Sequence, residues 1–267
     1  MIDWKPWYRA EAESALGRGV VADAVSRWPE GDPEVRRVLR AGGAASFPHT
    51  TLSDSAQPLA RVATSLVAEG IERVVALGVL HASSGGDVAR EFSLDLFERV
   101  LAAAATVRGV APPDLVREFV GAPPPGSSRD EHARAVAARV RPRLGARAAL
   151  VATGDLVHAG SGYSTPAETA ALPTHPERLR AHFEARVQTM LDAATSDRPD
   201  EADAIARELR SDQRHVLPVL LALLRGASTG VRARVVSFTL ADYGPILGQP
   251  APCVVASALV TFERGEP

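Results

Sequence analysis

The sequence predicts a single α/β domain spanning residues 1–267, in which helices flank a mixed central β-sheet. Two short runs, 74–79 and 148–153, are apolar on both faces, as strands of a covered parallel sheet are. Stretches of helical spacing separate them, and two further strand-like runs at 231–241 and 253–262 close the chain. A chain of 267 residues, 46% apolar and 23% charged, is long and apolar enough for one large core.

The first half of the chain is expected to form four helices and one strand. Apolar residues recur at helical spacing in 8–28, 33–39, 55–69 and 94–107. Gly70 follows the third of these helices and is a stop signal for it. The strand at 74–79 comes next, and its lack of a polar face predicts burial on both sides.

The second half begins with the clearest break in the chain. The loop at 121–128 is rich in glycine and proline, and it precedes an expected helix at 129–141 and the strand at 148–153. Residues 159–176 are rich in Gly, Ser, Thr and Pro and form a loop that is long for a compact domain, so they are candidates to line a site. The remaining expected elements are helices at 177–194 and 200–225 and the two closing strands.

Charge and cysteine content exclude several classes of protein. The formal net charge of −2 gives no reason to expect nucleic acid or a membrane as partner. Cys253 is the only cysteine, so an intramolecular disulfide and a multi-cysteine metal site are excluded, and we interpret it as a small core residue. Without a secretory N-terminus or a run of ~18 apolar residues, a cytoplasmic location is the expectation.

Three of the seven histidines follow strand-like or apolar segments. They are His49, His81 and His158. Side chains just past the carboxyl ends of strands gather at one edge of an open α/β sheet, where ligands bind. Neutral imidazole is the commonest metal ligand in proteins, so the pattern predicts a metal centre.

The order of these motifs resembles the Memo family. The resemblance rests on Pro-His at 48–49, Leu-Gly-Val-Leu-His at 77–81, Thr-Gly-Asp-Leu-Val-His-Ala-Gly at 153–160, Asp-Gln-Arg-His at 212–215 and the closing strand. Together they cover roughly residues 46–262. Memo proteins share the fold of the catalytic subunits of class III extradiol dioxygenases, which are non-haem Fe(II) enzymes that open catechol rings with O2. The resemblance therefore implies a Memo-like domain and a metal-dependent oxidoreductase acting on a small aromatic or phenolic substrate.

Carried over position by position, the resemblance makes His49, His81 and Asp212 the metal ligands. Asp212 stands where Memo proteins have a cysteine and the dioxygenases have a glutamate. Two imidazoles and one carboxylate form the facial triad that binds Fe(II) and leaves positions open. Fe(II) is the expected metal, although this ligand set also accepts other divalent ions.

The resemblance gives four further residues a role near the metal. His158 is implied to be an acid or base, which suits an unperturbed pKa near ~6.5. Asp155 is expected to orient that imidazole or to bond a ligand's other ring nitrogen. Arg214 and His215 could bind an anionic substrate group, and in a helix His215 is better placed than Arg214 to share a face with Asp212.

Departures from the family leave an alternative open. Ala82 replaces a second histidine, and Phe92 and Phe97 stand where the family has histidines. Only nine residues separate His81 from Glu91. The alternative is therefore a catalytically silent Memo-like protein that binds a peptide or small ligand in the same cleft. A metal-dependent hydrolase or an unknown redox step is a third possibility.

Ordinary structural roles compete with each of these assignments. Histidines at strand ends are often structural, and Asp212 could be an exposed helix residue. Asp54 is either a reserve carboxylate ligand or, more simply, a helix cap. The segment 83–86 resembles a phosphate-cradling turn but lacks the rest of that motif, so we interpret it as a flexible turn. His132, His175 and His182 are expected at the surface, and the apolar closing strand could join subunits of a homo-oligomer.

Overall fold

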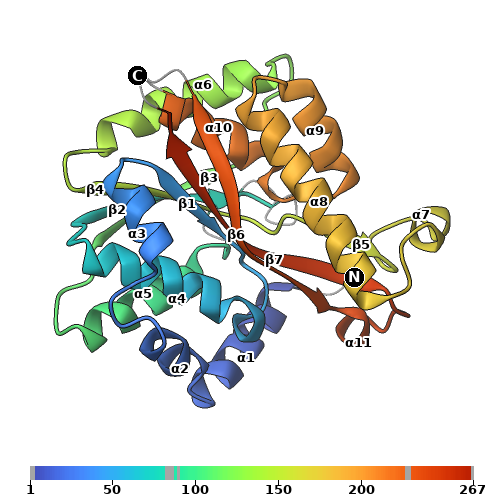
Figure 1. Ribbon diagram of the computed structural model, residues 1–267, viewed down its shortest axis with the longest axis horizontal. Helices are drawn as coiled ribbons and strands as arrows, with labels where there is room; N and C mark the ends of the chain where they lie inside the picture. Colours follow the sequence, from blue (N-terminus) through green and yellow to red (C-terminus); the bar gives the residue numbers. More distant parts are fainter. Residues whose placement is uncertain (1–3, 82–86, 89–90, 226–229, 266–267) are drawn as a thin grey trace.

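A computed structural model of the chain describes residues 4–81, 87–88, 91–225 and 230–265 (Figure 1). Its elements, in order, are α1 (Trp4–Gly17), α2 (Val20–Ser26), α3 (Pro33–Arg40), β1 (Ala44–Phe47), α4 (Leu52–Ala68), β2 (Arg73–Val79), α5 (Asp95–Val107), β3 (Asp114–Val120), α6 (Arg129–Val140), β4 (Ala148–Thr153), β5 (His158–Gly160), α7 (Pro166–Ala170), α8 (Pro176–Thr195), α9 (Pro199–Glu208), α10 (Gln213–Arg225), β6 (Val231–Asp242), α11 (Gly244–Leu247) and β7 (Cys253–Arg264). A short 3-10 turn, Arg141–Arg143, follows α6.

A seven-stranded mixed sheet forms the centre of the fold. The strand order is β3-β2-β4-β1-β7-β5, with β6 on the other side of β7. Strands β1 to β4 pair in parallel, whereas β7 pairs antiparallel with β1, β5 and β6. The predicted α/β class with a mixed central sheet is confirmed.

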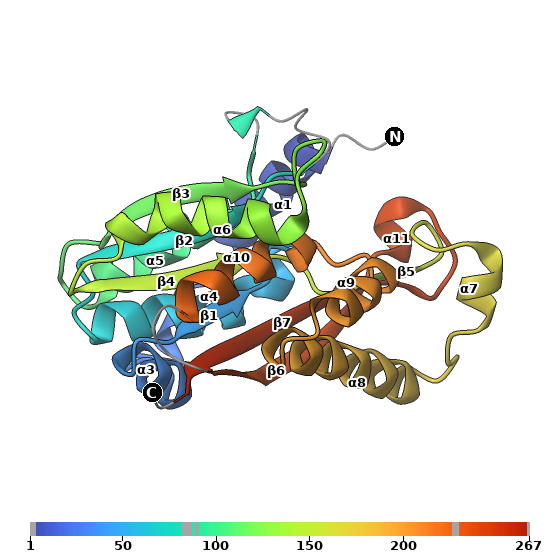
Figure 2. The same ribbon diagram turned by 90° about the horizontal axis from the view of Figure 1, so that it is seen from above.

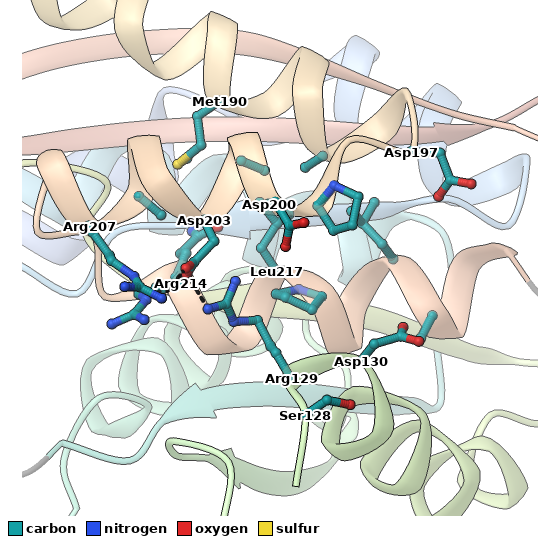
Figure 3. A pocket seen from close by; sticks show the side chains of 18 of the residues that line it. Ser128, Arg129, Asp130, Met190, Asp197, Asp200, Asp203, Arg207, Arg214 and Leu217 are labelled. Carbon is teal, nitrogen blue, oxygen red and sulfur yellow. Dashed lines mark hydrogen bonds and ion pairs between the residues drawn. The ribbon is translucent and has the colours of Figure 1, made fainter.

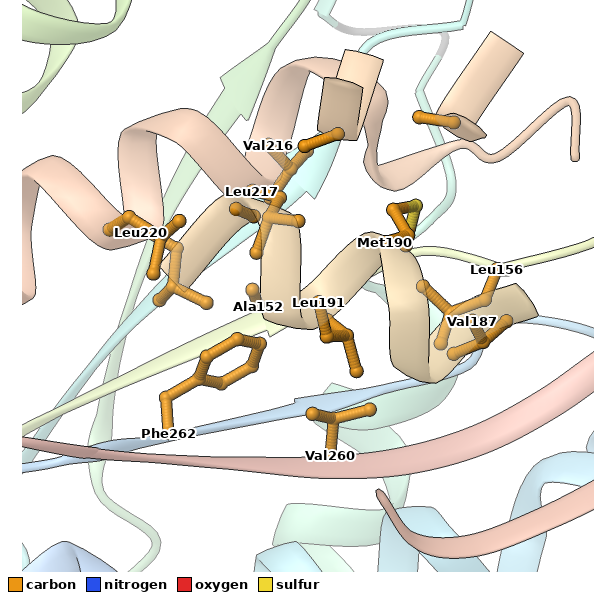
Figure 4. Packing of buried hydrophobic residues seen from close by; sticks show 14 of the residues in the cluster. Ala152, Leu156, Val187, Met190, Leu191, Val216, Leu217, Leu220, Val260 and Phe262 are labelled. Carbon is orange, nitrogen blue, oxygen red and sulfur yellow. The ribbon is translucent and has the colours of Figure 1, made fainter. Parts of the chain in front are cut away.

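Helices cover both faces of this sheet, as the apolar strands predict. Side chains alternate along β4, so that Val151 joins the core under the first five helices and Ala152 joins the core under α8 and α10. Figure 4 shows the second core, in which Met190 and Leu191 of α8 and Leu217 of α10 lie over the sheet. Both faces of the parallel strands are therefore buried, which explains their continuous apolar runs.

Three predicted elements differ in detail from the structure, and two strands, β1 and β3, were not predicted at all. The single helix expected at 8–28 is two helices, because Gly19 adopts a left-handed conformation with φ of 76°. The helix expected at 200–225 is also two, α9 and α10. The expected loop at 159–176 contains β5 and α7.

The closing strand contains the longest buried run of the sheet. Strand β7 has neighbours on both sides and is buried from Cys253 to Phe262. Cys253 is a free, buried thiol, which confirms its assignment as a core residue. The apolar character of β7 therefore reflects burial inside this sheet.

One end of the molecule projects from the layered body. The distal halves of β6 and β7, together with β5, α7 and α11, extend away from the rest in both ribbon views (Figures 1 and 2). This projection begins where β5 pairs with β7, beside the carboxyl ends of the parallel strands. Among the described residues, the helices are too short or too polar to cross a membrane.

Candidate metal centre

Three predicted site residues occupy equivalent positions after three parallel strands. His49 lies two residues after β1, His81 two residues after β2, and Asp155 two residues after β4. Because these strands pair in parallel, their carboxyl ends lie at one edge of the sheet. His158 opens β5 at the same edge. The predicted convergence of the three histidines is confirmed.

Asp212 reaches this edge from the break between α9 and α10. The prediction placed it inside a helix, but α10 begins at Gln213. The segment is bonded to the turn after β4, since the Asp212 amide donates to the Asp155 carbonyl at 2.9 Å and the His158 amide donates to the Leu209 carbonyl at 2.8 Å. These bonds fix the position of the carboxylate relative to the histidines.

Gly154 permits the close approach of Gln213 to the turn after β4. The side-chain amide of Gln213 donates to the Gly154 carbonyl at 3.0 Å and also to the Ser46 hydroxyl. The backbone of Gly154 has φ of +153°, and a Cβ there would lie 2.5 Å from Cγ of Gln213. A side chain at this position would push the start of α10, and Asp212 with it, away from the sheet.

The Asp212 carboxylate lies among the three imidazoles. Its Oδ2 atom is 3.2 Å from Nε2 of His49. The same oxygen is 3.8 Å from Nε2 of His81 and 3.8 Å from Nε2 of His158. Three side chains from three distant segments therefore present the same ring nitrogen to one carboxylate oxygen.

The other ring nitrogen of each histidine is bonded to an acceptor. His49 Nδ1 donates to Thr153 Oγ1 at 3.2 Å, because the Thr153 hydroxyl itself donates to the Phe47 carbonyl. His81 Nδ1 donates to Glu91 Oε1 at 2.9 Å. These acceptors assign the proton of each neutral ring to Nδ1 and leave the lone pair on Nε2.

The third histidine has a backbone acceptor. His158 Nδ1 donates to the Arg210 carbonyl at 2.9 Å. Arg210 adopts a left-handed conformation with φ of 50°, which is uncommon for a residue with a side chain. Nδ1 is therefore bonded to an acceptor in all three rings, and all three Nε2 atoms face Asp212.

Asp155 lies on the Nε2 side of His49 and His158. It was expected to bind the other ring nitrogen or to orient His158, but Nδ1 of each ring is bonded to another acceptor. Its Oδ1 atom accepts from the His49 amide at 3.0 Å, and its Oδ2 atom is 4.0 Å from Nε2 of both His49 and His158. Complete burial raises the pKa of Asp155, against the attraction of the two histidines. This carboxyl group is a second oxygen facing the same space.

Burial and neighbouring charges shift the pKa values of the Asp212 and Glu91 carboxylates and of His81 in opposite directions. Burial works against ionisation of Asp212, but the neighbouring histidines outweigh it and hold the pKa of this carboxyl well below its usual range. Burial likewise opposes protonation of His81, yet Asp212 and Glu91 raise its pKa to about 10. Despite its own burial, Glu91 has a pKa lowered to about 2 by His81. In the metal-free protein a proton on His81 thus partly neutralises the carboxylates.

The residues present fit a divalent metal ion. Two overlapping groups have ligand atoms within 4.8 Å of one another: His49, His81 and Asp212, and Asp155, His158 and Asp212. Ligand atoms held at ~2.1 Å from one ion lie roughly 3 Å from each other, so small side-chain movements would complete the coordination. Imidazole and carboxylate ligands accept several divalent ions, and the ligand set does not select one of them.

Aromatic side chains surround the centre. The ring of Phe92 stacks on His81, with centroids 5.3 Å apart and planes 2° apart, and Tyr163 lies over His158 with centroids 5.2 Å apart. Tyr8 contacts Phe92 and bonds to Tyr243. All three tyrosines of the chain therefore lie beside the metal centre.

Arg214 and His215 lie farther from the three Nε2 atoms. Arg214 Nε binds Asp203 Oδ1 at 2.7 Å. His215 lines a cavity together with His81 and Asp212, and its Nδ1 atom is buried with no hydrogen-bond partner among the described residues. His215 is in neither of the ligand groups found among those residues. Both residues are close to the centre but outside the ligand set.

The remaining candidates have structural positions. Thr51 caps α4, and Asp54 in its first turn accepts from the Thr51 hydroxyl at 2.6 Å, so Asp54 itself is not the cap and is in neither ligand group of the described residues. His175 and His182 are exposed as predicted, whereas His132 is half-buried. Residues 83–86 and Ala82 lie outside the described residues.

Sequence reasoning missed the groups that hold the histidines. Thr153 ends a predicted strand and pairs with Phe47 in register, which is a signal that its side chain lies near the residue after β1. Glu91 lies ten residues after His81, and no pattern marked it as the partner of that ring. The Arg210 carbonyl has no sequence signal at all, because any residue provides a backbone carbonyl.

Comparison with known proteins returns no matching family model and no matching curated protein. The resemblance to Memo proteins therefore stays a prediction from the ordered motifs. The chemistry proposed for the site therefore rests on the arrangement of its side chains.

Proposed function

We propose that this protein is a metal-dependent oxidoreductase of the non-haem Fe(II) type that acts on a small aromatic or phenolic substrate. The arrangement of three Nε2 atoms around Asp212 Oδ2, with every Nδ1 bonded to an acceptor, carries this proposal. We assign the metal to His49, His81 and Asp212. When bound there, Fe(II) would supply redox chemistry with O2 and open coordination positions beside the substrate.

The residues of this chain would position the substrate and move its protons. Nε2 of His158 faces the same space and could accept a proton from a substrate hydroxyl. Asp155, with Oδ2 4.0 Å from that nitrogen, would then stabilise the imidazolium. Phe92, which stacks on His81, and Tyr163, which is tilted against His158, provide aromatic surface beside which an aromatic substrate could pack.

Anaerobic titration with Fe(II), followed by metal analysis, tests the proposal. We expect one equivalent to bind the native protein and the control Asp23→Ala, which changes an exposed carboxylate on α2. Asp212→Ala should lose at least about 100-fold in affinity, since even the partners of metal ligands contribute 10- to 100-fold. Equal binding by Asp212→Ala would contradict the assignment.

A second variant separates a metal ligand from a proton-transfer group. His158→Gln should keep Fe(II) binding and lose O2 uptake in a panel of catechols if His158 moves protons. Loss of Fe(II) by this variant would instead make His158 a ligand. Native protein that binds Fe(II) but consumes no O2 with any catechol would contradict the oxidoreductase and favour a metal-dependent hydrolase or a binding protein.

A further inference from the structure

A cavity of about 380 Å³ lies beside the metal centre. His81 and Asp212 line it. Three arginines on α9, α10 and the turn between them also line it: Arg207, Arg210 and Arg214. The cavity thus joins the metal centre to a group of cationic side chains.

Within the described part of the chain, these arginines have fewer acidic partners than guanidinium groups. Asp203 is buried, and it binds Arg207 Nη2 through Oδ2 at 2.7 Å and Arg214 Nε through Oδ1 at 2.7 Å. Arg129 of α6 binds the same carboxylate at 2.5 Å. We call Asp203 with Arg129, Arg207 and Arg214 the arginine cluster. Figure 3 shows these four side chains drawn together between α6, α9 and α10.

The arginine cluster contains three guanidinium groups and one carboxylate. Its formal charge is therefore positive by two. Arg210 binds Glu168 through Nη2 at 2.9 Å and the Glu208 carbonyl through Nη1 at 3.2 Å, and within the described residues its Nε makes no hydrogen bond. The local excess of positive charge favours an anion beside these arginines.

Hydrogen-bond donors are present for such an anion. Arg214 uses Nε for Asp203, and within the described residues its two Nη groups make no other hydrogen bond. A guanidinium group has five N–H donors in a planar fork that matches a carboxylate. His215 lines the same cavity, and its buried Nδ1 lacks a hydrogen-bond partner among the described residues.

The effect of this charge is evident at His215. Burial, followed by the charges of Arg214 and Arg129, lowers the pKa of His215 to about 4. The imidazole is therefore neutral at neutral pH and is able to donate one hydrogen bond. It does not compete with the arginines for an anion.

We propose that the substrate carries a carboxylate group, which binds Arg210 and Arg214 in this cavity while the rest of the molecule reaches the metal centre. This inference rests on the proposed function for the role of the metal centre, but the anion site itself does not require a metal. Because His81 and Asp212 line the same cavity as the arginines, one small molecule could bring its carboxylate to the arginines and its reacting group to the metal centre. A neutral catechol would use only half of the site.

Benzoate and benzamide test the carboxylate site directly, because they have the same shape and differ in charge. Isothermal titration into the metal-free protein excludes any bond from benzoate to a metal. We expect benzoate to bind at least about tenfold more tightly than benzamide, since hydrogen bonds to charged groups contribute ~1.5–3 kcal/mol. Arg214→Gln and Arg210→Gln should each reduce that ratio, and the control Arg180→Gln, an exposed arginine of α8, should not.

Folding and metal binding are checked on the same samples. Arg214→Gln leaves Arg129 and Arg207 on Asp203, so the buried carboxylate keeps two partners. Equal binding of benzoate and benzamide, or a preference that survives in the double variant Arg210→Gln/Arg214→Gln, would overturn the inference. Retained benzoate preference without Fe(II) binding would overturn the proposed function and leave the arginine site in place.

Discussion

Two polar clusters lie close together along residues 203–215, and they use similar residue types in opposite ways. In the metal centre, Asp212 faces the Nε2 atoms of three histidines, which can offer lone pairs to a metal when the rings are neutral. In the arginine cluster, Asp203 faces three guanidinium groups. One carboxylate is surrounded by bases and the other by permanent cations, so only the first has partners that could share a metal ion.

The two clusters also differ in the hydrogen bonds made by Nδ1 of their histidines. Every histidine of the metal centre has Nδ1 bonded to an acceptor, whereas His215 beside the arginine cluster has a buried Nδ1 with no acceptor among the described residues. Histidine and aspartate near one another do not by themselves predict a metal site. The bond that fixes the ring and its tautomer is what distinguishes the two clusters.

Removing the acceptor of His81 should have the largest effect on the metal centre. Glu91→Gln removes the charge that orients the ring, and we expect metal affinity to fall by about 10- to 100-fold. Fe(II) or Zn(II) titration measures this, with Glu177→Gln, which changes an exposed carboxylate in the first turn of α8, as control. An unchanged affinity would show that the Glu91 contact does not position the ring for metal.

Removing the carboxylate of the arginine cluster should affect stability and leave the metal centre intact. Asp203→Ala leaves three guanidinium groups without a counter-charge. Loss of one partner of a buried pair costs ~3–5 kcal/mol, and because these arginines are partly exposed we expect about 2 kcal/mol. Urea unfolding of the metal-free protein measures the change. A large loss of metal affinity in this variant would contradict the separation of the two clusters.

The neutral acceptor of His49, Thr153, should contribute less to metal affinity than the charged acceptor of His81, Glu91. Thr153→Val keeps the shape at the end of β4 but removes the oxygen that accepts from His49 Nδ1. A neutral hydrogen bond is worth ~1 kcal/mol, so metal affinity should fall by about fivefold. An effect as large as that of Glu91→Gln would mean that charge is not what separates the two acceptors.

The smallest expected effect is a pH dependence of stability near the arginine cluster. His215 has a folded-state pKa of about 4 against 6.5 in the unfolded chain, so protonation favours unfolding. The free energy of unfolding therefore does not change with the protonation of His215 above pH 6.5. It decreases as the pH falls from 6.5 toward 4, because the unfolded chain binds the proton more readily. The groups that face His215 are Arg214, Arg129, Asp203 and His132. Native protein should lose more stability between pH 7 and pH 5 than His215→Gln, as measured by urea unfolding; equal losses would exclude His215 as the source.

The sequence predicted the convergence of the side chains that follow the parallel strands, because such strands impose it. His49, His81 and Asp155 each follow an apolar run, and the ends of such strands meet wherever the sheet is parallel. Asp212 could be named only through a resemblance, since no strand precedes it. Its position depends on long-range bonds to the Asp155 carbonyl and from Gln213, which no local pattern reveals.

Elements were missed where local signals are weak. Strand β3 contains Arg117 and Glu118 and lies at the sheet edge, so it lacks the apolar run of its neighbours. The break between α9 and α10 contains neither glycine nor proline. It depends on the left-handed Arg210, whose carbonyl is bonded to His158. The arginine cluster could not be predicted from local sequence patterns either, because Asp203 and Arg129 are far apart in sequence.

The tautomers of the three histidines test the central claim most directly. Long-range nitrogen–proton NMR of the protein loaded with Zn(II) distinguishes a protonated from a metal-bound ring nitrogen. We expect His49 and His81 to carry the proton on Nδ1 and to bind metal through Nε2, and His158 to keep its proton on Nδ1. Spectra in which His49 or His81 keeps a proton on Nε2 after Zn(II) is added would contradict a shared metal ion at this edge of the sheet.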